Sequence, residues 1–272
     1  MRDNEEKQLN SLMEAVSKSA KYRNVSSDLV RSIGLQELAK RPSFRAALKA
    51  TRNKLHQVGG AYLDREFRYG VLLQEIRLAY QFGDQDGVRR VLKGIMNYHS
   101  STRERLAILE QFYTTILGDL PPIHSVIDVG CGFHPLAIPW MPLAEDVEYY
   151  AYDIYEDMVD FLNGAMELIG VEGYAQVCDV LQSCPRHRVD VAFVLKAIPC
   201  LEQVDKLAGV RLLEGIDAEH LVVSFPARSL GGRQKGMVGN YEARFWELVA
   251  GKSWGIRRFE FASELVFVVS KR

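Results

Sequence analysis

The sequence has little of what secreted, membrane-spanning or disulfide-rich proteins require. Its 272 residues include only four cysteines and no Cys-x-x-Cys pair, which is typical of a reduced cytoplasmic chain. The longest apolar run, Leu136–Ala144, is broken by two prolines and is far shorter than the roughly 20 residues of a membrane helix. The charged start of the chain is not followed by a signal-peptide core. We therefore expect a cytoplasmic protein without a membrane span.

The cysteines also fail to form a standard metal pattern. Cys178, Cys184, His187 and Cys200 are close in the sequence, but their spacing matches no common zinc motif. We expect no metal, with a zinc site as the disfavoured alternative. The composition, 47% hydrophobic and 25% charged, supplies a substantial core without metal or disulfides. The length fits one large domain, or an ordinary domain with an extension.

The formal net charge of −1 hides a strong asymmetry. Residues 1–70 carry 14 Lys+Arg and 8 Asp+Glu, a net charge of +6, whereas the remaining 202 residues carry 20 and 27, a net charge of −7. A basic module on an acidic body favours a polyanionic partner. A solvated helical surface is the plainer explanation of the same charges.

The basic region is predicted to be helical. Ser26–Asp28 can cap one helix, Pro42-Ser43 can open another, and Gly59-Gly60 can end it. Helical periodicity returns at 69–80 and 88–96. We predict a helical, basic extension over residues 1–97 and a second domain over residues 98–272.

After residue 120 the pattern changes to short β-branched or aromatic runs separated by helical stretches. The predicted strands are Ser125–Val129, Val147–Tyr152, Ala175–Cys178, Val189–Leu195, His220–Phe225, Ile256–Ala262 and Glu264–Ser270; the predicted helices include Glu156–Ile169 and Cys200–Glu214. Alternating strands and helices indicate a parallel α/β sheet that binds ligands at the carboxyl ends of its strands. The last two strands are so close that they must form an antiparallel hairpin. This arrangement resembles the sheet of class I S-adenosylmethionine-dependent methyltransferases.

A glycine motif follows the first predicted strand. Asp128-Val-Gly130-Cys-Gly132 provides a tight turn without Cβ atoms, as a ligand lying against the backbone requires. The third glycine of a dinucleotide fingerprint is replaced by Pro135, which disfavours NAD. The motif resembles motif I of methyltransferases.

Two further acids follow the next predicted strands. Asp153, 25 residues after Asp128, is suited to holding a ribose diol, and Asp179 to accepting from an adenine amino group. A helix cap and a turn residue are the structural alternatives. Ser101–Glu104 resembles a capping box that would start a helix reaching Ile116. Arg103 would lie in its first turn, where a cation is disfavoured; pairing with a cofactor carboxylate would explain that position, and an ordinary exposed arginine is the plainer alternative.

Five segments together resemble the aminoglycoside-resistance 16S rRNA methyltransferases of the Arm/Rmt group. They are His99–Arg105, Ile127–Ala137, Tyr150–Asp153, Leu195–Gln203 and Ser224–Gly236. The resemblance implies methyl transfer from S-adenosylmethionine to N7 of a guanine in the decoding site of the assembled small (30S) ribosomal subunit, and hence aminoglycoside resistance. It further implies that Arg103 pairs with the cofactor carboxylate, that Gly130 and Gly132 pass beneath the cofactor, and that Asp153 and Asp179 hold the ribose and adenine. Lys196 and Gln203 would line the methyl-transfer pocket as catalytic residues.

The chemistry agrees with this resemblance. Guanine N7 carries an exposed lone pair, so the enzyme can work by positioning a flipped base without removing a proton. Cys200 favours a different product, because cytosine C5 methylation needs a cysteine nucleophile; adenine N1 is a third target. A small-molecule methyltransferase and a non-enzymatic RNA-binding protein each explain only part of the sequence.

The predicted RNA-binding residues are cations from two segments. Lys18, Lys21 and Arg23 belong to the basic extension, and Arg228, Arg233 and Lys235 belong to a glycine-rich loop. An ordinary crossover loop is the alternative for the second set. Phosphate contacts predict strongly salt-dependent binding to 16S rRNA. Without a long exposed apolar stripe, we expect a monomer.

Overall fold

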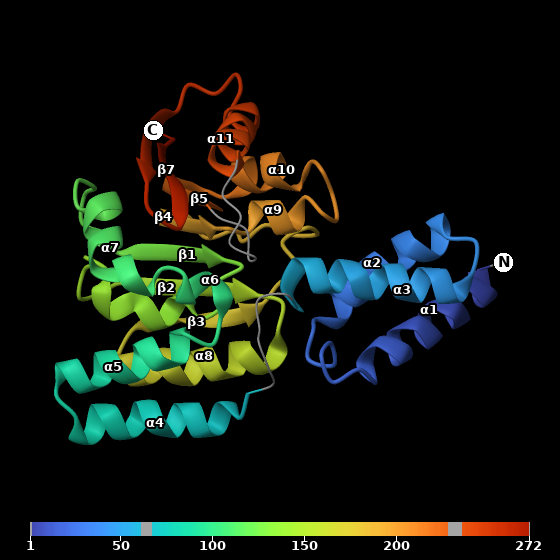
Figure 1. Cartoon of the computed structure of the whole chain (residues 1–272), viewed down its shortest axis with the longest axis horizontal. Helices are drawn as coiled ribbons and strands as arrows, with labels where there is room; N and C mark the ends of the chain where they lie inside the picture. The colour runs from blue at the N-terminus through green and yellow to red at the C-terminus, as the bar shows by residue number, and fades with distance from the viewer. Residues whose placement is uncertain (1, 61–66, 228–235, 272) are drawn as a thin grey trace.

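The β-branched and aromatic runs after residue 120 form the seven strands of one sheet (Figure 1). The structure is a computed structural model that describes residues 2–60, 67–227 and 236–271. The strands are β1 (Ser125–Val129), β2 (Glu148–Asp153), β3 (Glu172–Val177), β4 (Val189–Leu195), β5 (Ala218–Pro226), β6 (Gly255–Glu260) and β7 (Glu264–Ser270). Their order across the sheet is β3-β2-β1-β4-β5-β7-β6.

The pairing confirms the predicted methyltransferase-type sheet. Strands β1 to β5 pair in parallel, and β7 is antiparallel to both β5 and β6. The final hairpin therefore places its second strand inside the sheet, which is why residues 265–269 are all buried. The predicted bounds of β1, β4 and β7 are correct. Strand β3 begins earlier than predicted and ends at Val177, so Asp179 lies two residues beyond it.

Helices cover both faces of the sheet. One face carries α4 (Tyr69–Phe82), α5 (Gln85–Met96), α7 (Leu109–Leu117), the 3-10 helix η3 (His134–Trp140) and α8 (Glu156–Ile169). The other carries α9 (Ile198–Leu201), α10 (Ala208–Gly215) and α11 (Met237–Leu248). Because side chains alternate along a strand, Val126 of β1 packs into the first layer while Ile127 and Val129 pack into the second.

Two predicted helices are broken in the structure. The stretch predicted to run from Ser101 to Ile116 divides into α6 (Ser100–Arg103), the 3-10 helix η2 (Leu106–Ile108) and α7. The capping box does not form, since α6 begins after His99 without a side-chain cap. The break turns Arg105 into the core, where it pairs with a carboxylate of β7. The predicted helix Cys200–Glu214 likewise divides into α9 and α10.

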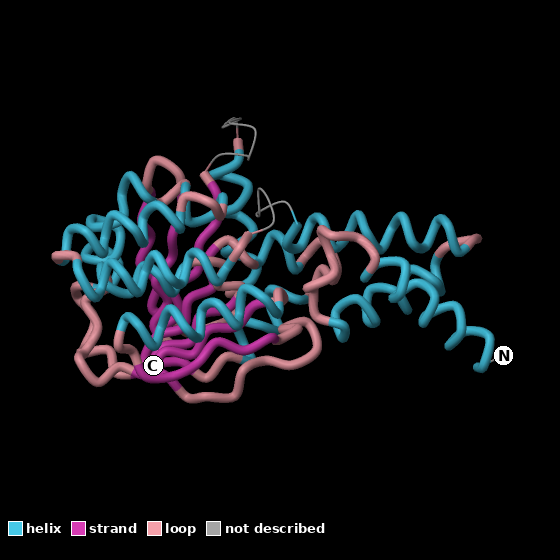
Figure 2. The backbone as a smooth tube through the Cα atoms, turned by 90° about the horizontal axis from the view of Figure 1, so that it is seen from below, coloured by secondary structure: helices cyan, strands magenta, loops and turns pink. Residues whose placement is uncertain are grey.

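The N-terminal helices form a lobe that projects from the sheet (Figures 1 and 2). The lobe contains α1 (Arg2–Ser17), α2 (Ser27–Lys40), α3 (Phe44–Leu55) and a π-helical turn η1 (His56–Gly60). Ser26 and Ser43 cap α2 and α3 as predicted, and α3 continues as η1 up to Gly60, the last residue described before Phe67. The predicted extension 1–97 thus includes this lobe and the pair α4–α5, which packs on α8 and η3. No helix in the described part of the chain is long and apolar enough to cross a membrane.

The lobe is attached where β2 ends. Val25 forms an antiparallel bridge with Tyr155, the Ser26 amide donates to the Ile154 carbonyl at 2.8 Å, and the Glu156 amide donates to the Asn24 carbonyl at 2.8 Å. These bonds fix the turn after α1 beside the carboxyl edge of the sheet.

Candidate cofactor and methyl-transfer site

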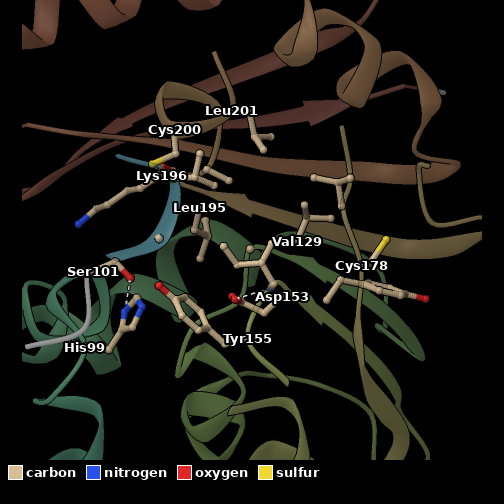
Figure 3. Close-up of a pocket in the computed structure, with 17 residues that line it drawn as sticks. His99, Ser101, Val129, Asp153, Tyr155, Cys178, Leu195, Lys196, Cys200 and Leu201 are labelled. Carbon is tan, nitrogen blue, oxygen red and sulfur yellow. Dashed lines mark hydrogen bonds between the residues drawn. The ribbon is translucent and has the colours of Figure 1, made fainter. Parts of the chain in front are cut away.

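A cavity lies at the carboxyl ends of β1, β2 and β4 (Figure 3). It contains about 670 Å³ of space, part of it open to solvent. Its walls come from six parts of the chain: Val58 and Gly59; His99 and Ser101; Val129 and Gly130; Tyr152–Tyr155; Cys178 and Val180; and Leu195–Ala197 with Cys200 and Leu201. The lobe therefore contributes to the wall through η1.

The glycine loop is held closely between two neighbours. Gly130 and Gly132 have φ angles of 62° and 52°, which favour glycine because a Cβ is disfavoured there. A Cβ on Gly132 would also lie 2.6 Å from the His99 ring, and one on Gly130 would lie 3.3 Å from the Ala197 Cβ. The predicted need for glycine at both positions therefore has a steric basis.

Asp153 lies in the cavity wall as predicted. Its carboxylate accepts hydrogen bonds from the Gly132 amide at 2.9 Å and from the Ile154 amide at 2.7 Å. Burial raises the pKa of Asp153 to about 6, against the lowering effect of these amides. The side chain thus connects the end of β2 to the glycine loop and keeps an acidic group at the cavity.

Asp179 is buried between the cavity residues Cys178 and Val180. One carboxylate oxygen accepts from the Leu181 amide at 3.0 Å, while Oδ2 is buried and has no hydrogen-bond partner among the described residues. Burial, with the negative charge of Asp28 as a further contribution, raises the pKa of Asp179. A buried acceptor without a partner is costly, and a ligand that donates a hydrogen bond would remove that cost.

Asp128 occupies a different position from the other two acids. It is buried on the opposite face of β1 from Val129, where its Oδ2 accepts from the Tyr149 hydroxyl at 2.9 Å and lies 2.7 Å from His134 Nδ1. It does not line the cavity. The structure therefore makes Asp128 a support beneath the glycine loop.

Arg103 and Gln203 lie outside the cavity wall. Arg103 is the exposed last residue of α6 and donates to the Asn97 carbonyl at 3.4 Å. Gln203 is exposed after α9 and donates to the Pro199 carbonyl at 3.4 Å. In place of Arg103, the same short helix presents His99 and Ser101 to the cavity, joined by a 2.9 Å hydrogen bond (Figure 3).

Lys196 lines the cavity, but its ammonium group is fully engaged. Nζ donates to Glu104 Oε2 at 2.6 Å and lies 3.6 Å from Glu264 Oε2. Lys196 is also the one non-glycine residue with a positive φ, 59°, in the part of the chain that the structure describes. Such a conformation costs about 1–3 kcal/mol and is concentrated at functional sites.

Lys196 also contacts the buried ion pair of Arg105 and Glu264. Arg105 binds Glu264 through two hydrogen bonds of 3.1 and 2.6 Å, and the Ser224 hydroxyl donates to Glu264 Oε1 at 2.5 Å. Burial alone would raise the pKa of Glu264, but Arg105, Lys196 and the hydrogen bonds outweigh it and lower the pKa to about 2. The residue pattern did not reveal this network, although a glutamate at the start of the apolar strand β7 was a signal for it.

The predicted RNA-binding cations are placed only in part. Lys18, Lys21 and Arg23 are exposed in the turn between α1 and α2, and Lys18 forms a surface ion pair with Glu14 at 2.7 Å. The next residues, Asn24–Ser26, are bonded to residues 154–156 after β2. Arg228, Arg233 and Lys235 lie outside the described residues.

Comparison with known proteins agrees with this architecture along nearly the whole chain. The sequence family described as "Ribosomal RNA methyltransferase (FmrO)" matches residues 18–268. The chain is 35% identical to a 16S rRNA (guanine(1405)-N(7))-methyltransferase of Micromonospora rosea, covering 97% of each chain, and 37% identical to one from Frankia casuarinae, covering 98% of this chain and 95% of that protein. The crystal structure of 16S rRNA methyltransferase RmtF with S-adenosyl-L-homocysteine superposes with a TM-score of 0.83 at 27% identity, covering 97% of this chain and 98% of that one.

Proposed function

Because this chain belongs to the family of ribosomal RNA methyltransferases, we propose that it methylates N7 of a guanine in the decoding site of 16S rRNA, with S-adenosylmethionine as methyl donor. The product is the modified small ribosomal subunit, which resists aminoglycosides. The observation that carries this proposal is the match to guanine-N7 enzymes over 97% of the chain, which includes the cavity and the lobe.

The cavity residues fit the cofactor. Two glycines leave the loop after β1 open to a ligand on its backbone, and the partnerless Asp179 Oδ2 suits an adenine amino donor. Asp153 is the acceptor for the ribose hydroxyls, at the end of β2. When bound, the cofactor supplies an electrophilic methyl on a sulfonium centre. Asp128 acts on the cofactor indirectly, by fixing the strand end through Tyr149 and His134.

The role of Arg103 requires a movement of its side chain. It is two residues along α6 from Ser101, which lines the cavity, and its guanidinium donates to the Asn97 carbonyl at 3.4 Å. Pairing with the cofactor carboxylate would draw the guanidinium toward Ser101. An Arg103→Gln variant is expected to weaken cofactor binding if this role is correct.

Catalysis on this chain is by positioning. Guanine N7 attacks through its lone pair, so no residue has to remove a proton, and alignment of the two reactants supplies the rate enhancement. Lys196 lines the cavity on the side formed by the turn after β4, and Gln203 follows α9 outside the cavity wall. We assign the target base to this side.

The alternative of cytosine C5 methylation rests on Cys200, which does line the cavity. A nucleophilic cysteine needs a neighbour that stabilises its thiolate. The nearest candidate cation, Lys196, is held by two carboxylates, and its side chain extends away from the Cys200 sulfur (Figure 3). The geometry therefore favours guanine N7.

The RNA partner is bound by the lobe and the basic loop. Lys18, Lys21 and Arg23 are exposed in a turn whose last residues are bonded to residues 154–156 after β2, and we assign them contacts with rRNA phosphates that bring a decoding-site nucleotide toward the cofactor. We assign Arg228, Arg233 and Lys235 the same task. Neutralising these three is expected to weaken RNA association while leaving cofactor binding intact, and equal loss of both would refute the division.

The decisive experiment is to incubate the protein with labelled S-adenosylmethionine and either intact 30S subunits or naked 16S rRNA, and then to map the modified base. We expect N7-methylguanine in the decoding site, on intact subunits only. Asp153→Asn should abolish most incorporation, whereas Asp146→Asn, which alters an exposed carboxylate paired with His124, should not. N1-methyladenine or C5-methylcytosine would refute the assigned target, and no incorporation would refute the RNA substrate.

A further inference from the structure

The chain reverses sharply at Lys196, between the end of β4 and the start of α9. The Lys196 amide still donates to the Ser224 carbonyl at 3.0 Å, as a continuation of the pairing of β4 with β5. Its positive φ then turns the chain so that Ala197 contacts the glycine loop. Because Lys196 and Ala197 both line the cavity, the shape of this turn sets the cavity wall where the methyl acceptor must lie.

Local backbone contacts hold part of that turn, since the Cys200 amide donates to the Ala197 carbonyl at 3.0 Å and Cys200 Sγ to the Lys196 carbonyl at 3.6 Å, but they do not explain a lysine at this φ. Glycine or asparagine is the usual choice for a left-handed residue, and lysine gains no local hydrogen bond there. The residue is also anchored by its side chain, only 4% exposed, whose ammonium group lies 2.6 Å from Glu104 and 3.6 Å from Glu264. Glu264 is already bound by Arg105 and Ser224, so Glu104 is the carboxylate dedicated to Lys196.

The charges around Lys196 also indicate a role for Glu104 in the proposed N7 reaction. Methyl transfer moves a positive charge from the sulfonium onto the guanine ring, and an uncompensated ammonium nearby would oppose it. Two glutamates and two cations make the network of Glu104, Arg105, Lys196 and Glu264 neutral. A proton-transfer role for Lys196 is also unnecessary, since N7 has no proton to lose.

We propose that Glu104 is a positioning residue for methyl transfer: by binding the Lys196 ammonium it holds the left-handed turn 196–197 in place and neutralises the charge beside the reacting base. Glu104 comes from the short segment after α6, and the Ser263 hydroxyl donates to its carbonyl oxygen at 2.9 Å. Its backbone is thus fixed independently of its side chain. This inference rests on the proposed function.

The test is a double-mutant cycle between Glu104→Gln and Lys196→Gly, assayed with labelled S-adenosylmethionine and 30S subunits. Alone, Glu104→Gln should lower kcat at least tenfold while the Kd for S-adenosylmethionine changes less than threefold. Glycine adopts the turn without a side-chain anchor, so Lys196→Gly should retain at least tenfold more activity than Lys196→Ala. In the Lys196→Gly background, Glu104→Gln should change kcat less than twofold. Glu110→Gln, in an exposed pair with Lys93, is the matched control.

Three results would overturn the proposal. Unchanged kcat in Glu104→Gln would show that the carboxylate is dispensable, and a persistent tenfold loss in the Lys196→Gly background would show that it acts by another route. Equal activity of the Gly and Ala variants would show that the turn is not what Lys196 provides. Failure of the wild-type protein to methylate 30S subunits would refute the proposed function itself, which separates the two hypotheses.

Discussion

The lobe and the sheet each bury one glutamate between two cations, and they do so differently. In the lobe, Glu37 binds Arg41 one helical turn away and Lys54 on the next helix, and these cations are 47% and 17% exposed. In the sheet, Glu264 binds Arg105 and Lys196, which are 2% and 4% exposed. Arg105 is 159 residues away in the sequence.

The difference reflects what each region does. The lobe is made of neighbouring helices whose cations remain near water, where they are available to a polyanion. In the sheet, Arg105 and Lys196 are buried, and both pair with Glu264 beside the cavity wall. Their charges are therefore neutralised inside the protein and are not available to a partner. The same pair of residue types thus serves a surface in one region and the geometry of a site in the other.

The strongest test of this comparison is Arg105→Met against Arg41→Met. Removing one partner of a fully buried pair costs about 3–5 kcal/mol, whereas Arg41 is 47% exposed and its loss leaves Glu37 paired with Lys54, so a cost of about 1 kcal/mol or less is expected. Urea unfolding should therefore show a large loss for Arg105→Met and a small one for Arg41→Met. Equal losses would mean that burial does not distinguish the two glutamates.

Glycine-to-alanine substitutions test whether the glycine loop after β1 and the lobe differ in their effect on cofactor binding. Gly132→Ala places a methyl 2.6 Å from the His99 ring at a φ of 52°, so we expect at least a tenfold loss of S-adenosylmethionine affinity by calorimetry. Gly34→Ala in the lobe meets the ends of two side chains, Leu12 at 2.9 Å and Leu9 at 3.3 Å, which can rotate. Its cofactor affinity should stay within twofold of wild type, and a loss like that of Gly132→Ala would contradict the separation.

The pH dependence of cofactor binding should come from the sheet. With a pKa of about 6, Asp153 is ionised at pH 7 and mostly protonated at pH 5, where it accepts ribose hydroxyls less well. Affinity for S-adenosylmethionine should fall about tenfold between these pH values, and Asp153→Asn should remove most of that dependence. A pH profile that is unchanged in the variant would assign the titration to another group.

Substitution of the exposed lobe cations is expected to have the smallest effect on stability and a specific effect on RNA binding. Changing Lys18, Lys21 and Arg23 together to Gln should alter the free energy of unfolding by less than about 0.5 kcal/mol per site. The slope of log Kd for 30S subunits against log salt should fall by about two to three, if each cation meets one phosphate. An unchanged slope would place the RNA elsewhere on the protein.

Much of the fold was predictable because its signals are local. Strand runs such as Val189–Leu195, the caps Ser26 and Ser43, and the glycines after β1 each carry their structural reason within a few residues. Asp153 was predicted at the cavity for the same reason, since it ends a strand whose neighbours were identified. Two predicted helices are interrupted in the structure, one around Arg105 and one after Leu201. Helical periodicity in the sequence does not show these breaks, because it does not include contacts with distant parts of the chain.

The sequence by itself determined the order of strands and helices, the charge contrast between the two regions, and the motif that identifies the family. Only the tertiary structure decided which acids reach the cavity: Asp153 lines it, Asp179 lies between its lining residues Cys178 and Val180, and Asp128 is turned to the opposite face of its strand. It also decided that Lys196 is held by Glu104 and Glu264, from segments 92 residues before it and near the end of the chain. Local conformational preferences depend on neighbouring residues in the sequence, whereas a buried charge needs partners that only folding brings within reach.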